Sequence, residues 1–288
     1  MTSSKLSLIN LIFREMLTSD RTERRPEPSS VMRDPQNVKS FHDQGGGSNA
    51  LIPVYYFNAL AVSALLPQGG TLIDLGSGTG QFLSYLARCR SDCRIVGLEL
   101  SEEMVSVGER SLKTSGLDAR IRLHVGDMTN FSRYISERVD VVSSIFAFHH
   151  LPSSENLIRC LSEIKEVRKR WDCGIWIFDH ARPRSIETAK LFPDIFTPEA
   201  PESFKSDSMN SLLASFSFRE LTESIDAASL RTCNHERSRI LRLYQIHWLK
   251  SDGGRMAERQ AFSCKVELSR RQYSLFRQLR MLFKRAPF

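Results

Sequence analysis

The chain has 288 residues, of which 41% are hydrophobic and 25% charged, a composition that is typical of a globular protein and excludes a largely disordered one. No apolar run reaches the roughly 18–20 residues of a transmembrane helix, and the apolar residues 6–13 lack the cleavage site of a signal peptide. The net charge of +7 lies in residues 253–288, which hold nine basic and two acidic side chains. A nucleic-acid-binding surface over the whole protein is therefore not indicated.

The six cysteines form no CxxC pair and are spread thinly through apolar segments. They are Cys89, Cys93, Cys160, Cys173, Cys233 and Cys264. This usage predicts reduced thiols in a cytoplasmic protein without a metal centre.

The N-terminal part of the chain is expected to be helical and then irregular. Residues 4–17 carry an apolar stripe that is typical of an amphipathic helix, formed by Leu6, Ile9, Leu11, Ile12, Phe13 and Met16. Residues 18–50 are polar, contain three prolines and end in three glycines, which predicts a loop-rich arm with a flexible joint. A helix is expected over residues 52–65.

From residue 71 onward, short β-branched strands alternate with helical segments. The expected strands are 71–75, 94–100, 121–125, 139–143 and 174–179, and the expected helices are 80–90, 102–114 and 154–170, with a short helix after the third strand. Ser101 is placed to cap the helix that begins at residue 102. This order predicts a parallel sheet covered by helices on both faces.

The alternation then breaks at a proline-containing segment, which predicts an insertion over residues 181–215. Ser217 and Glu220 have the spacing of a capping box for a helix at 218–228. Strand-like runs near 229–235 and 239–248 suggest a hairpin at one sheet edge, and residues 266–284 form a basic amphipathic pattern. We therefore expect an arm (1–50), a core (51–252) and a basic extension (253–288).

A glycine-rich loop follows the first strand, with the sequence TLIDLGSGTG at residues 71–80. Its GxGxG spacing differs from the GxGxxG of dinucleotide sites, and Asp74 precedes it at a point that suits a cationic ligand better than a pyrophosphate. Glu99 ends the second strand, where an acid can accept hydrogen bonds from both ribose hydroxyls. Asp127 and Met128 follow the third strand, where a purine could be recognised.

These motifs, together with residues 139–152, resemble those of the class I S-adenosylmethionine-dependent methyltransferases. The resemblance implies a doubly wound, mostly parallel seven-stranded sheet of the Rossmann-like type, and S-adenosylmethionine as cofactor. It implies that the cofactor is bound by Asp74, Gly76, Ser77, Gly78, Gly80, Glu99, Leu100, Asp127, Met128 and Ser144.

The segment after the fourth strand indicates the class of methyl acceptor. It lacks the Asn/Asp-Pro-Pro-Tyr/Phe motif of enzymes that methylate bases in nucleic acids, and resembles the small-molecule branch. The leading hypothesis is methyl transfer to an O, N or C atom of a small metabolite, in bacterial specialised metabolism. The alternatives are a peptide, protein or RNA methyltransferase recruited by the basic tail, and a cofactor-binding regulatory protein without turnover.

Three histidines follow sheet strands on the side where ligands bind in such folds, and are candidates for a general base. They are His149, His150 and His180. Candidate substrate contacts are Phe41, His42, Tyr55, Tyr56 and Arg182, the last for an acidic substrate. For each of these residues, ordinary packing or solvation is the alternative.

The basic tail has three interpretations. Its apolar stripe can pack on the core or on a second subunit, with a homodimer as one outcome. Its arginines can bind anionic lipid at a membrane surface or RNA. It can also bind an acidic carrier or peptide that bears the substrate.

Overall fold

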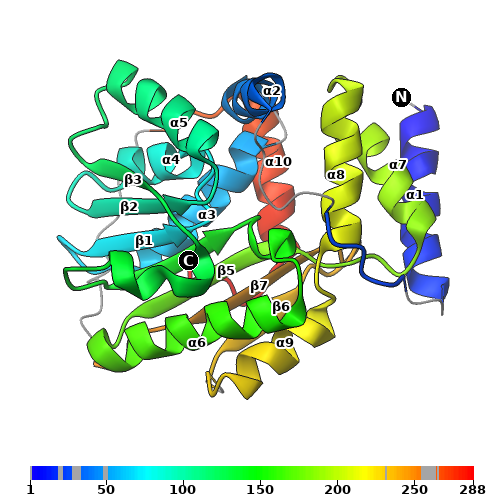
Figure 1. The fold of residues 1–288 in the computed structure, drawn as a ribbon. Coiled ribbons are helices and arrows are strands. Elements are labelled where there is room, and N and C mark those ends of the chain that lie inside the picture. The colour runs from blue at the N-terminus through cyan, green and yellow to red at the C-terminus, as the bar shows by residue number, and fades with distance from the viewer. Residues whose placement is uncertain are drawn as a thin grey trace.

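The computed structural model describes residues 2–18, 22–27, 34–47, 51–230, 232–253, 264 and 266–288. Seven strands form one sheet in the order β3-β2-β1-β4-β5-β7-β6 (Figure 1). The strands are β1 (Thr71–Leu75), β2 (Arg94–Glu99), β3 (Ile121–Val125), β4 (Val141–Ile145), β5 (Gly174–His180), β6 (Asn234–Arg237) and β7 (Tyr244–Leu249). No described helix is both long enough and apolar enough to cross a membrane.

The pairing of the strands confirms the doubly wound sheet. Strands β1 to β5 are parallel, and β7 adds to β5 in the antiparallel direction, with β6 beyond it. Strand β1 lies between β2 and β4, so the order of the chain reverses there, and this switch point is where open α/β sheets bind ligands. Strands β4, β6 and β7 each begin two or more residues later than the sequence predicted.

Helices cover both faces of the sheet (Figure 1). One core cluster joins the sheet to α3 (Leu51–Leu65), α4 (Gln81–Cys89) and α5 (Glu102–Thr114). The other joins it to α6 (Ser154–Trp171), α9 (Phe218–Ala227) and the short η1 (Met128–Tyr134). Ser101 caps α5 by accepting a hydrogen bond from Met104 N, and Ser217 and Glu220 form the expected capping box of α9.

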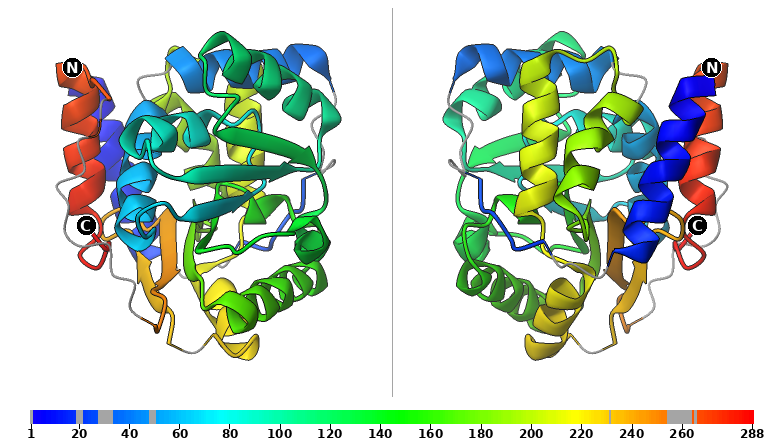
Figure 2. Two further views of the ribbon diagram at one scale, coloured as in Figure 1. Left: turned by 90° about the vertical axis from the view of Figure 1, so that its left-hand side faces the viewer. Right: turned by 90° about the vertical axis from the view of Figure 1, so that its right-hand side faces the viewer.

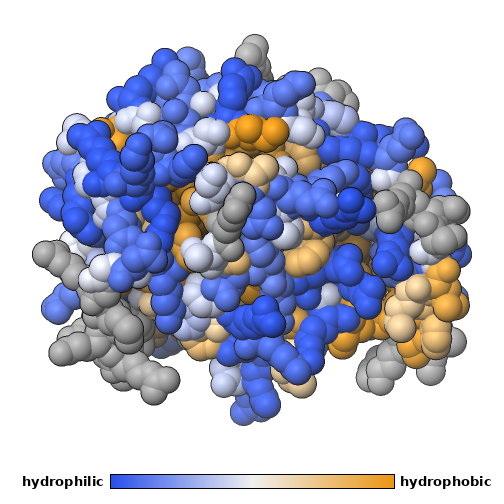
Figure 3. All heavy atoms as spheres, turned by 90° about the horizontal axis from the view of Figure 1, so that it is seen from below, coloured by the Kyte–Doolittle hydropathy of each residue, from blue (hydrophilic) through white to orange (hydrophobic). Residues whose placement is uncertain are grey.

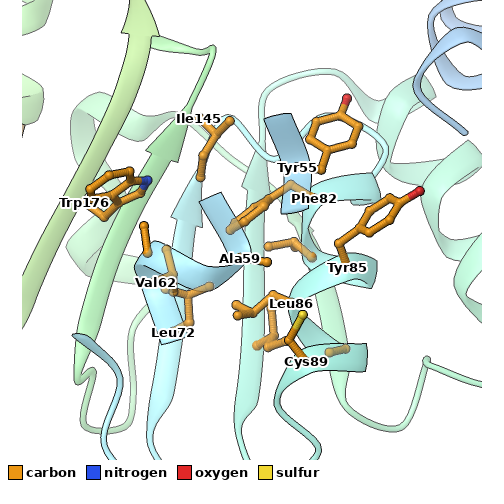
Figure 4. Close-up of a cluster of buried hydrophobic side chains, with 14 of the residues drawn as sticks. Tyr55, Ala59, Val62, Leu72, Phe82, Tyr85, Leu86, Cys89, Ile145 and Trp176 are labelled. Carbon is orange, nitrogen blue, oxygen red and sulfur yellow. The ribbon is translucent and has the colours of Figure 1, made fainter. Parts of the chain in front are cut away.

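Helix α3 is buried along most of its length, and its side chains lie between the sheet and α4 (Figure 4). Tyr55 packs against Tyr85 of α4, with ring centroids 5.8 Å apart. Asn58, the buried amide of this helix, accepts a hydrogen bond of 2.7 Å from the Trp176 indole and donates to Val54 O. Burying this polar group is thus compensated, because both ends of the amide are hydrogen-bonded.

The N-terminal arm is more ordered than the sequence predicted. A helix, α2 (Pro35–Gly47), occupies the segment interpreted as loop and flexible joint. Asp34 accepts a hydrogen bond from Gln36 N, and Pro35 stands at the first helical position, where a proline is well tolerated. Val38 is fully buried, so tertiary packing outweighs the low helix propensity of the glycines.

The insertion consists of two helices, α7 (Ile186–Phe196) and α8 (Glu202–Ala214), and α1 (Thr2–Leu17) packs on α7. Leu11 of α1 is buried, and Glu15 accepts the backbone N–H groups of Arg184 and Ser185. Ile9, Phe13 and Met16, expected on the apolar stripe that packs, are instead at least half exposed. An apolar patch accordingly lies at the right-hand edge of the molecule, on the side that holds α1 and α7 (Figure 3).

The described part of the basic tail packs its apolar side chains on the core. Helix α10 (Arg270–Met281) runs along α3 (Figure 2), and Phe276 packs edge-on against Tyr56. Phe283 is 1% exposed and packs against Phe57, with ring centroids 5.6 Å apart. The hydrophobic core therefore includes side chains beyond residue 253, and the division into core and extension stays a prediction.

Two of the six cysteines are paired, which corrects the expectation of six reduced thiols. A disulfide joins Cys89, at the end of α4, to Cys264 in the tail. The other four cysteines are buried and free. Sequence spacing could not reveal the pair, because 175 residues separate its two members.

Candidate active site at the carboxyl ends of the strands

A pocket of about 770 Å³ opens at the carboxyl ends of the central strands, within the range of about 300–1,000 Å³ that is typical of ligand sites. One part is lined by the glycine loop and by the ends of β2 and β3. The other part is lined by the arm, by the segment after β4, by His180 of β5, by Tyr244 of β7, and by helices α7 and α8. The pocket therefore joins the parallel sheet to the arm and the insertion.

The glycine loop brings backbone groups to the pocket wall. Gly76 has a φ of +73°, and a Cβ there would lie 2.3 Å from Ala147 Cβ, so no other residue fits without a shift. Gly78 also has a positive φ, and its N–H donates to Glu99 Oε2 over 2.9 Å. Ser77 Oγ is buried and has no hydrogen-bond partner among the described residues. The loop thus leaves a polar group for a ligand to satisfy.

Two carboxylates stand where the next strands end. Glu99 closes β2, and its second oxygen accepts the backbone N–H of Ser101. Asp127 caps η1 by accepting the N–H of Thr129 over 2.7 Å, with Met128 beside it in the pocket wall. Both carboxylates are held in place by backbone donors, so their orientation does not depend on a bound ligand.

Asp74 is a buried acid at the base of this part of the pocket. Burial raises its pKa, and although a 2.6 Å hydrogen bond from Ser143 Oγ opposes the shift, the pKa reaches about 7. The nearby charge of Glu99 adds to the increase. A cationic ligand group near Asp74 would favour its ionised form.

Eight of the ten predicted cofactor contacts line the pocket, and two do not. Those in the wall are Asp74, Gly76, Ser77, Gly78, Glu99, Leu100, Asp127 and Met128. Gly80 instead forms the N-cap of α4 in the left-handed conformation. Ser144 is buried and donates to Leu75 O, which ties β4 to β1. Their contribution is therefore to shape the loop and the sheet.

His149 is buried and paired with an acid that the sequence reasoning missed. Its Nδ1 donates to Asp179 Oδ1 over 2.7 Å, and its backbone N–H donates to Asp179 Oδ2 over 3.0 Å. Burial opposes ionisation of Asp179, but the charge and hydrogen bond of His149 outweigh it and lower the pKa of this carboxyl. The sequence does contain a signal for this residue, because Asp179 is an acid at the carboxyl end of the fifth predicted strand.

His150 is paired with Glu27 from the N-terminal arm. The two groups are 2.6 Å apart, from His150 Nδ1 to Glu27 Oε2, and Ser211 Oγ donates to the other oxygen of Glu27. Burial alone would raise the pKa of Glu27, but the contact with His150 lowers it to about 2. In turn, Glu27 outweighs the effect of burial on His150 and raises the pKa of this histidine. Nothing in the sequence connects residues 27 and 150.

His180 lies in a stack of aromatic rings. Its ring is 4.5 Å from that of Phe146 and 5.4 Å from that of Tyr244, nearly parallel to both. Burial, with the charge of His149, lowers the pKa of His180 to about 3, and its buried Nδ1 has no partner among the described residues. A ring with so low a pKa is neutral at physiological pH and is a weak base, so it suits stacking or a single hydrogen bond.

Aromatic side chains form much of this part of the pocket wall. Phe146 has a φ of +53°, a conformation that is strained for a residue other than glycine and that is often found at functional sites. Phe192 packs against Phe196 and Tyr244, with ring centroids 4.6 Å and 6.3 Å apart. These rings give this part of the pocket a flat apolar surface.

The candidate substrate contacts divide into two groups. Phe41 and Tyr55 line the pocket. Tyr56 packs on Phe276 of the tail, and His42 binds Thr79 Oγ1 through Nδ1 over 2.9 Å, which fixes α2 to the glycine loop.

Arg182 is not placed to bind an acidic substrate. Its guanidinium forms an ion pair of 2.6 Å with Glu220 and donates to Thr22 O and Ser215 O. It therefore joins the arm to the core.

The donor groups of Glu27, His149 and His150 lie within 4.8 Å of one another. The Nδ1 atoms of both rings are already bound to carboxylates, so we describe the group as a hydrogen-bonded cluster. The expectation that the protein has no metal centre stays a prediction.

Residues 72–170 match a family described as a methyltransferase domain. This segment is a methyltransferase domain of the class I S-adenosylmethionine-dependent type. An uncharacterized protein of Haemophilus influenzae is 34% identical over 124 residues, 42% of this chain and 46% of that protein. A demethylmenaquinone methyltransferase of Bacteroides fragilis is 29% identical over 98 residues, 34% of this chain and 38% of that enzyme. The match to this chain therefore spans less than half the length of either relative.

The fold of the chain also resembles that of a solved structure. The plantazolicin methyltransferase BamL, solved in complex with a triazolic desmethylPZN analog and SAH, has a TM-score of 0.53 and 14% identity, over 100% of this chain and 94% of that one. S-adenosylmethionine is the cofactor of the family, and the pocket fits it. The glycine loop leaves backbone groups and Ser77 Oγ open, and Glu99 and Asp127 stand in the pocket wall.

Proposed function

We propose that the protein transfers a methyl group from S-adenosylmethionine to an O, N or C atom of a small metabolite, in the cytoplasm and in specialised metabolism. The observation that carries the proposal is that the cofactor motifs and a group of histidines and aromatic rings line one continuous pocket. Its volume of about 770 Å³ suits a cofactor with a small acceptor.

In this proposal the part of the pocket lined by the glycine loop and by the ends of β2 and β3, the cofactor half, holds S-adenosylmethionine through the glycine loop, Glu99 and Asp127. When bound, the cofactor supplies an activated methyl group on a sulfonium. Asp74, whose pKa is about 7, can ionise to complement a cationic group of the ligand.

The other part of the pocket, lined by the histidines, the aromatic rings, the arm and the insertion, is the acceptor half. It orients the substrate and excludes water. Phe146, Phe192 and Tyr244 contribute apolar surface against which an acceptor can pack. His149 and His150, each paired with a carboxylate through Nδ1, keep Nε2 as their remaining proton-accepting atom. An acceptor that must lose a proton would find a base there.

The packing of the tail bears on the rival hypothesis of recruitment through residues 253–288. Leu279 and Phe283 are buried against the core, so a large part of the apolar stripe is used within the chain. This favours the interpretation in which the tail packs on the core over those in which it binds lipid, RNA or a carrier.

Calorimetry with S-adenosylmethionine, S-adenosylhomocysteine and NAD tests the cofactor part of the proposal. We expect micromolar binding of the first two and none of NAD, because the GxGxG loop and Asp74 do not suit a pyrophosphate. Binding of NAD alone would contradict the proposal.

Transfer of a labelled methyl group to small molecules, peptides and RNA tests the acceptor class. Incorporation into RNA or a peptide alone would favour recruitment by the tail. Tight cofactor binding with no transfer to any acceptor would favour the regulatory hypothesis.

A further inference from the structure

We propose that His150 removes the proton of the methyl acceptor and that Glu27, carried by the N-terminal arm, is its positioning residue. The base is then complete only when the arm is docked on the core. This inference rests on the proposed methyl transfer, and it adds a role for a part of the chain outside the methyltransferase motifs.

Geometry selects His150 among the three histidines of the pocket. Its side chain is 37% exposed, whereas that of His149 is 3% exposed, so a proton taken by His150 can pass to solvent. The Nδ1–H of His150 donates to Glu27, which leaves Nε2 unprotonated in the neutral ring. His180 is held in a stack of rings.

Glu27 is itself held from two sides. One oxygen accepts from His150, and the other accepts from Ser211 Oγ of α8 over 2.8 Å. A carboxylate fixed in this way selects one tautomer of the imidazole and stabilises the imidazolium that forms when the proton arrives.

The charged and titratable groups that act on His150 lie in the arm, in β2, β5 and α8, and in the segment after β4. Glu27 lies in the arm and is in contact with the ring, whereas Glu99 of β2, Asp179 of β5 and Asp207 of α8 act from a distance. The other two histidines of the pocket, His149 and His180, also lie near. Burial lowers the pKa of His150, and the carboxylates, Glu27 foremost, raise it above its ordinary value.

The arm is fastened to the segment that carries the histidines. Arg24 donates hydrogen bonds to the carbonyl oxygens of His149, Leu151 and Pro152, and also to that of Ala214. Its guanidinium lies 4.0 Å from the centre of the Phe216 ring. Glu27 lies three residues after Arg24, so the contacts of Arg24 with the loop after β4 also fix the position of Glu27.

In the proposed step a proton moves to His150 and a methyl group moves to the acceptor. His150 Nε2 takes the proton from the O–H or N–H of the acceptor, and the electron pair left behind forms the bond to the methyl group. The bond between that methyl group and sulfur breaks, with its electrons remaining on sulfur. The proton then leaves the partly exposed imidazolium for solvent.

The test is a titration of the histidine ring signals by nitrogen-15 NMR, with the full chain saturated with S-adenosylhomocysteine. A His150→Gln variant assigns the signals of this ring. In Glu27→Gln we expect the pKa of His150 to fall by about 1–3 units, because the imidazolium loses an adjacent negative charge. The matched control is Glu23→Gln, in the same arm but exposed, for which no change is expected.

An unchanged pKa of His150 in Glu27→Gln, with S-adenosylhomocysteine still bound, would overturn the inference and leave the proposed methyl transfer intact. Failure of the unsubstituted chain to bind the product would instead defeat the proposed function. If Glu27→Gln does not fold, Glu27→Asp is the second variant, because it keeps the negative charge on a side chain one methylene shorter. In Glu27→Asp, a pKa of His150 equal to that of the wild type, together with a changed Nδ1 signal of His150, supports the contact. A change in the His150 signals of the unsubstituted chain on adding EDTA would overturn the inference in favour of a bound metal.

A second readout uses any acceptor that the methyl-transfer screen identifies. The rate should rise with pH through the pKa of His150, and in Glu27→Gln this limb should move to lower pH while the plateau falls. A lower plateau with an unmoved limb would mean that Glu27 has only a structural role.

Discussion

The two halves of the pocket are built in different ways. The cofactor half comes from residues 74–128, and its groups stand in the loops directly after β1, β2 and β3. The acceptor half gathers Glu27, Phe146, His180, Phe192 and Tyr244 from segments spread over more than two hundred residues. Parallel strands bring their carboxyl ends together by topology alone, whereas the acceptor half exists only when the arm and the insertion are packed on the sheet.

The chemistry of the two halves differs as well. The cofactor half uses backbone groups and carboxylates held by backbone donors. The acceptor half uses rings and histidines held by carboxylates. Substitutions should therefore separate into those that weaken cofactor binding and those that slow the methyl transfer.

The largest effect is expected for His150→Ala, which removes the proposed base. The turnover rate should fall by about 10²–10⁴-fold, with the dissociation constant of S-adenosylhomocysteine unchanged. Initial rates with a saturating acceptor, and calorimetry, measure the two quantities. His124→Ala, at an exposed position of β3, is the control. Wild-type turnover in His150→Ala would show that the transfer needs alignment and desolvation only.

The tail is a third region, and we expect it to contribute to the stability of the fold without contacting the cofactor or the acceptor. Phe283→Ala removes a ring that is 1% exposed and should lower the free energy of unfolding by about 3–5 kcal/mol. Urea unfolding measures the loss, and Met281→Ala, at a side chain that is 73% exposed, is the control. Cofactor affinity should remain unchanged at temperatures where the variant is folded. Equal stability of the two variants would mean that the tail is not part of the core.

Glu99→Ala should act on the cofactor half alone. Loss of a hydrogen bond to a charged group costs about 1.5–3 kcal/mol, which corresponds to a dissociation constant about 10–150-fold higher. Calorimetry with S-adenosylhomocysteine measures the change, against Glu102→Ala on the exposed first turn of α5. An unchanged constant would mean that Glu99 does not accept from the ribose.

Cofactor binding should depend on pH through Asp74. With a pKa of about 7 in the free protein, this acid is mostly protonated at pH 6 and mostly ionised at pH 8. A cationic ligand favours the ionised form, so affinity should rise about tenfold between these values. Asp74→Asn should abolish the dependence. A rise of the same size in Asp74→Asn would assign the titration to another group.

The smallest effect is expected for His180→Phe. A ring with a pKa of about 3 does not titrate near neutrality, so the acid limb of the rate profile should stay where it is. The phenyl ring should retain the stack between Phe146 and Tyr244. A shifted limb, measured on the acceptor used for His150→Ala, would return His180 to the candidates for the base.

Much of the cofactor half could be predicted from the sequence. Positive φ at Gly76 and Gly78 and the acids at the strand ends are local requirements, so residue type and spacing indicate them directly. Strand boundaries were less accurate where tertiary pairing determines them, as for β4, β6 and β7. The arm helix was missed because burial of Val38 outweighs the glycines that suggested a loop.

The sequence by itself determined the parallel sheet with helices on both faces and the ligand loop, because hydrophobic periodicity and glycine spacing act over a few residues. Only the tertiary structure decided that Glu27 meets His150, that Arg182 joins the arm to the core, and that Leu279 and Phe283 of the tail are buried. These contacts join segments more than a hundred residues apart, and no local pattern encodes them. They depend on how the arm, the insertion and the tail pack on the sheet, whose strand order does not depend on these three segments.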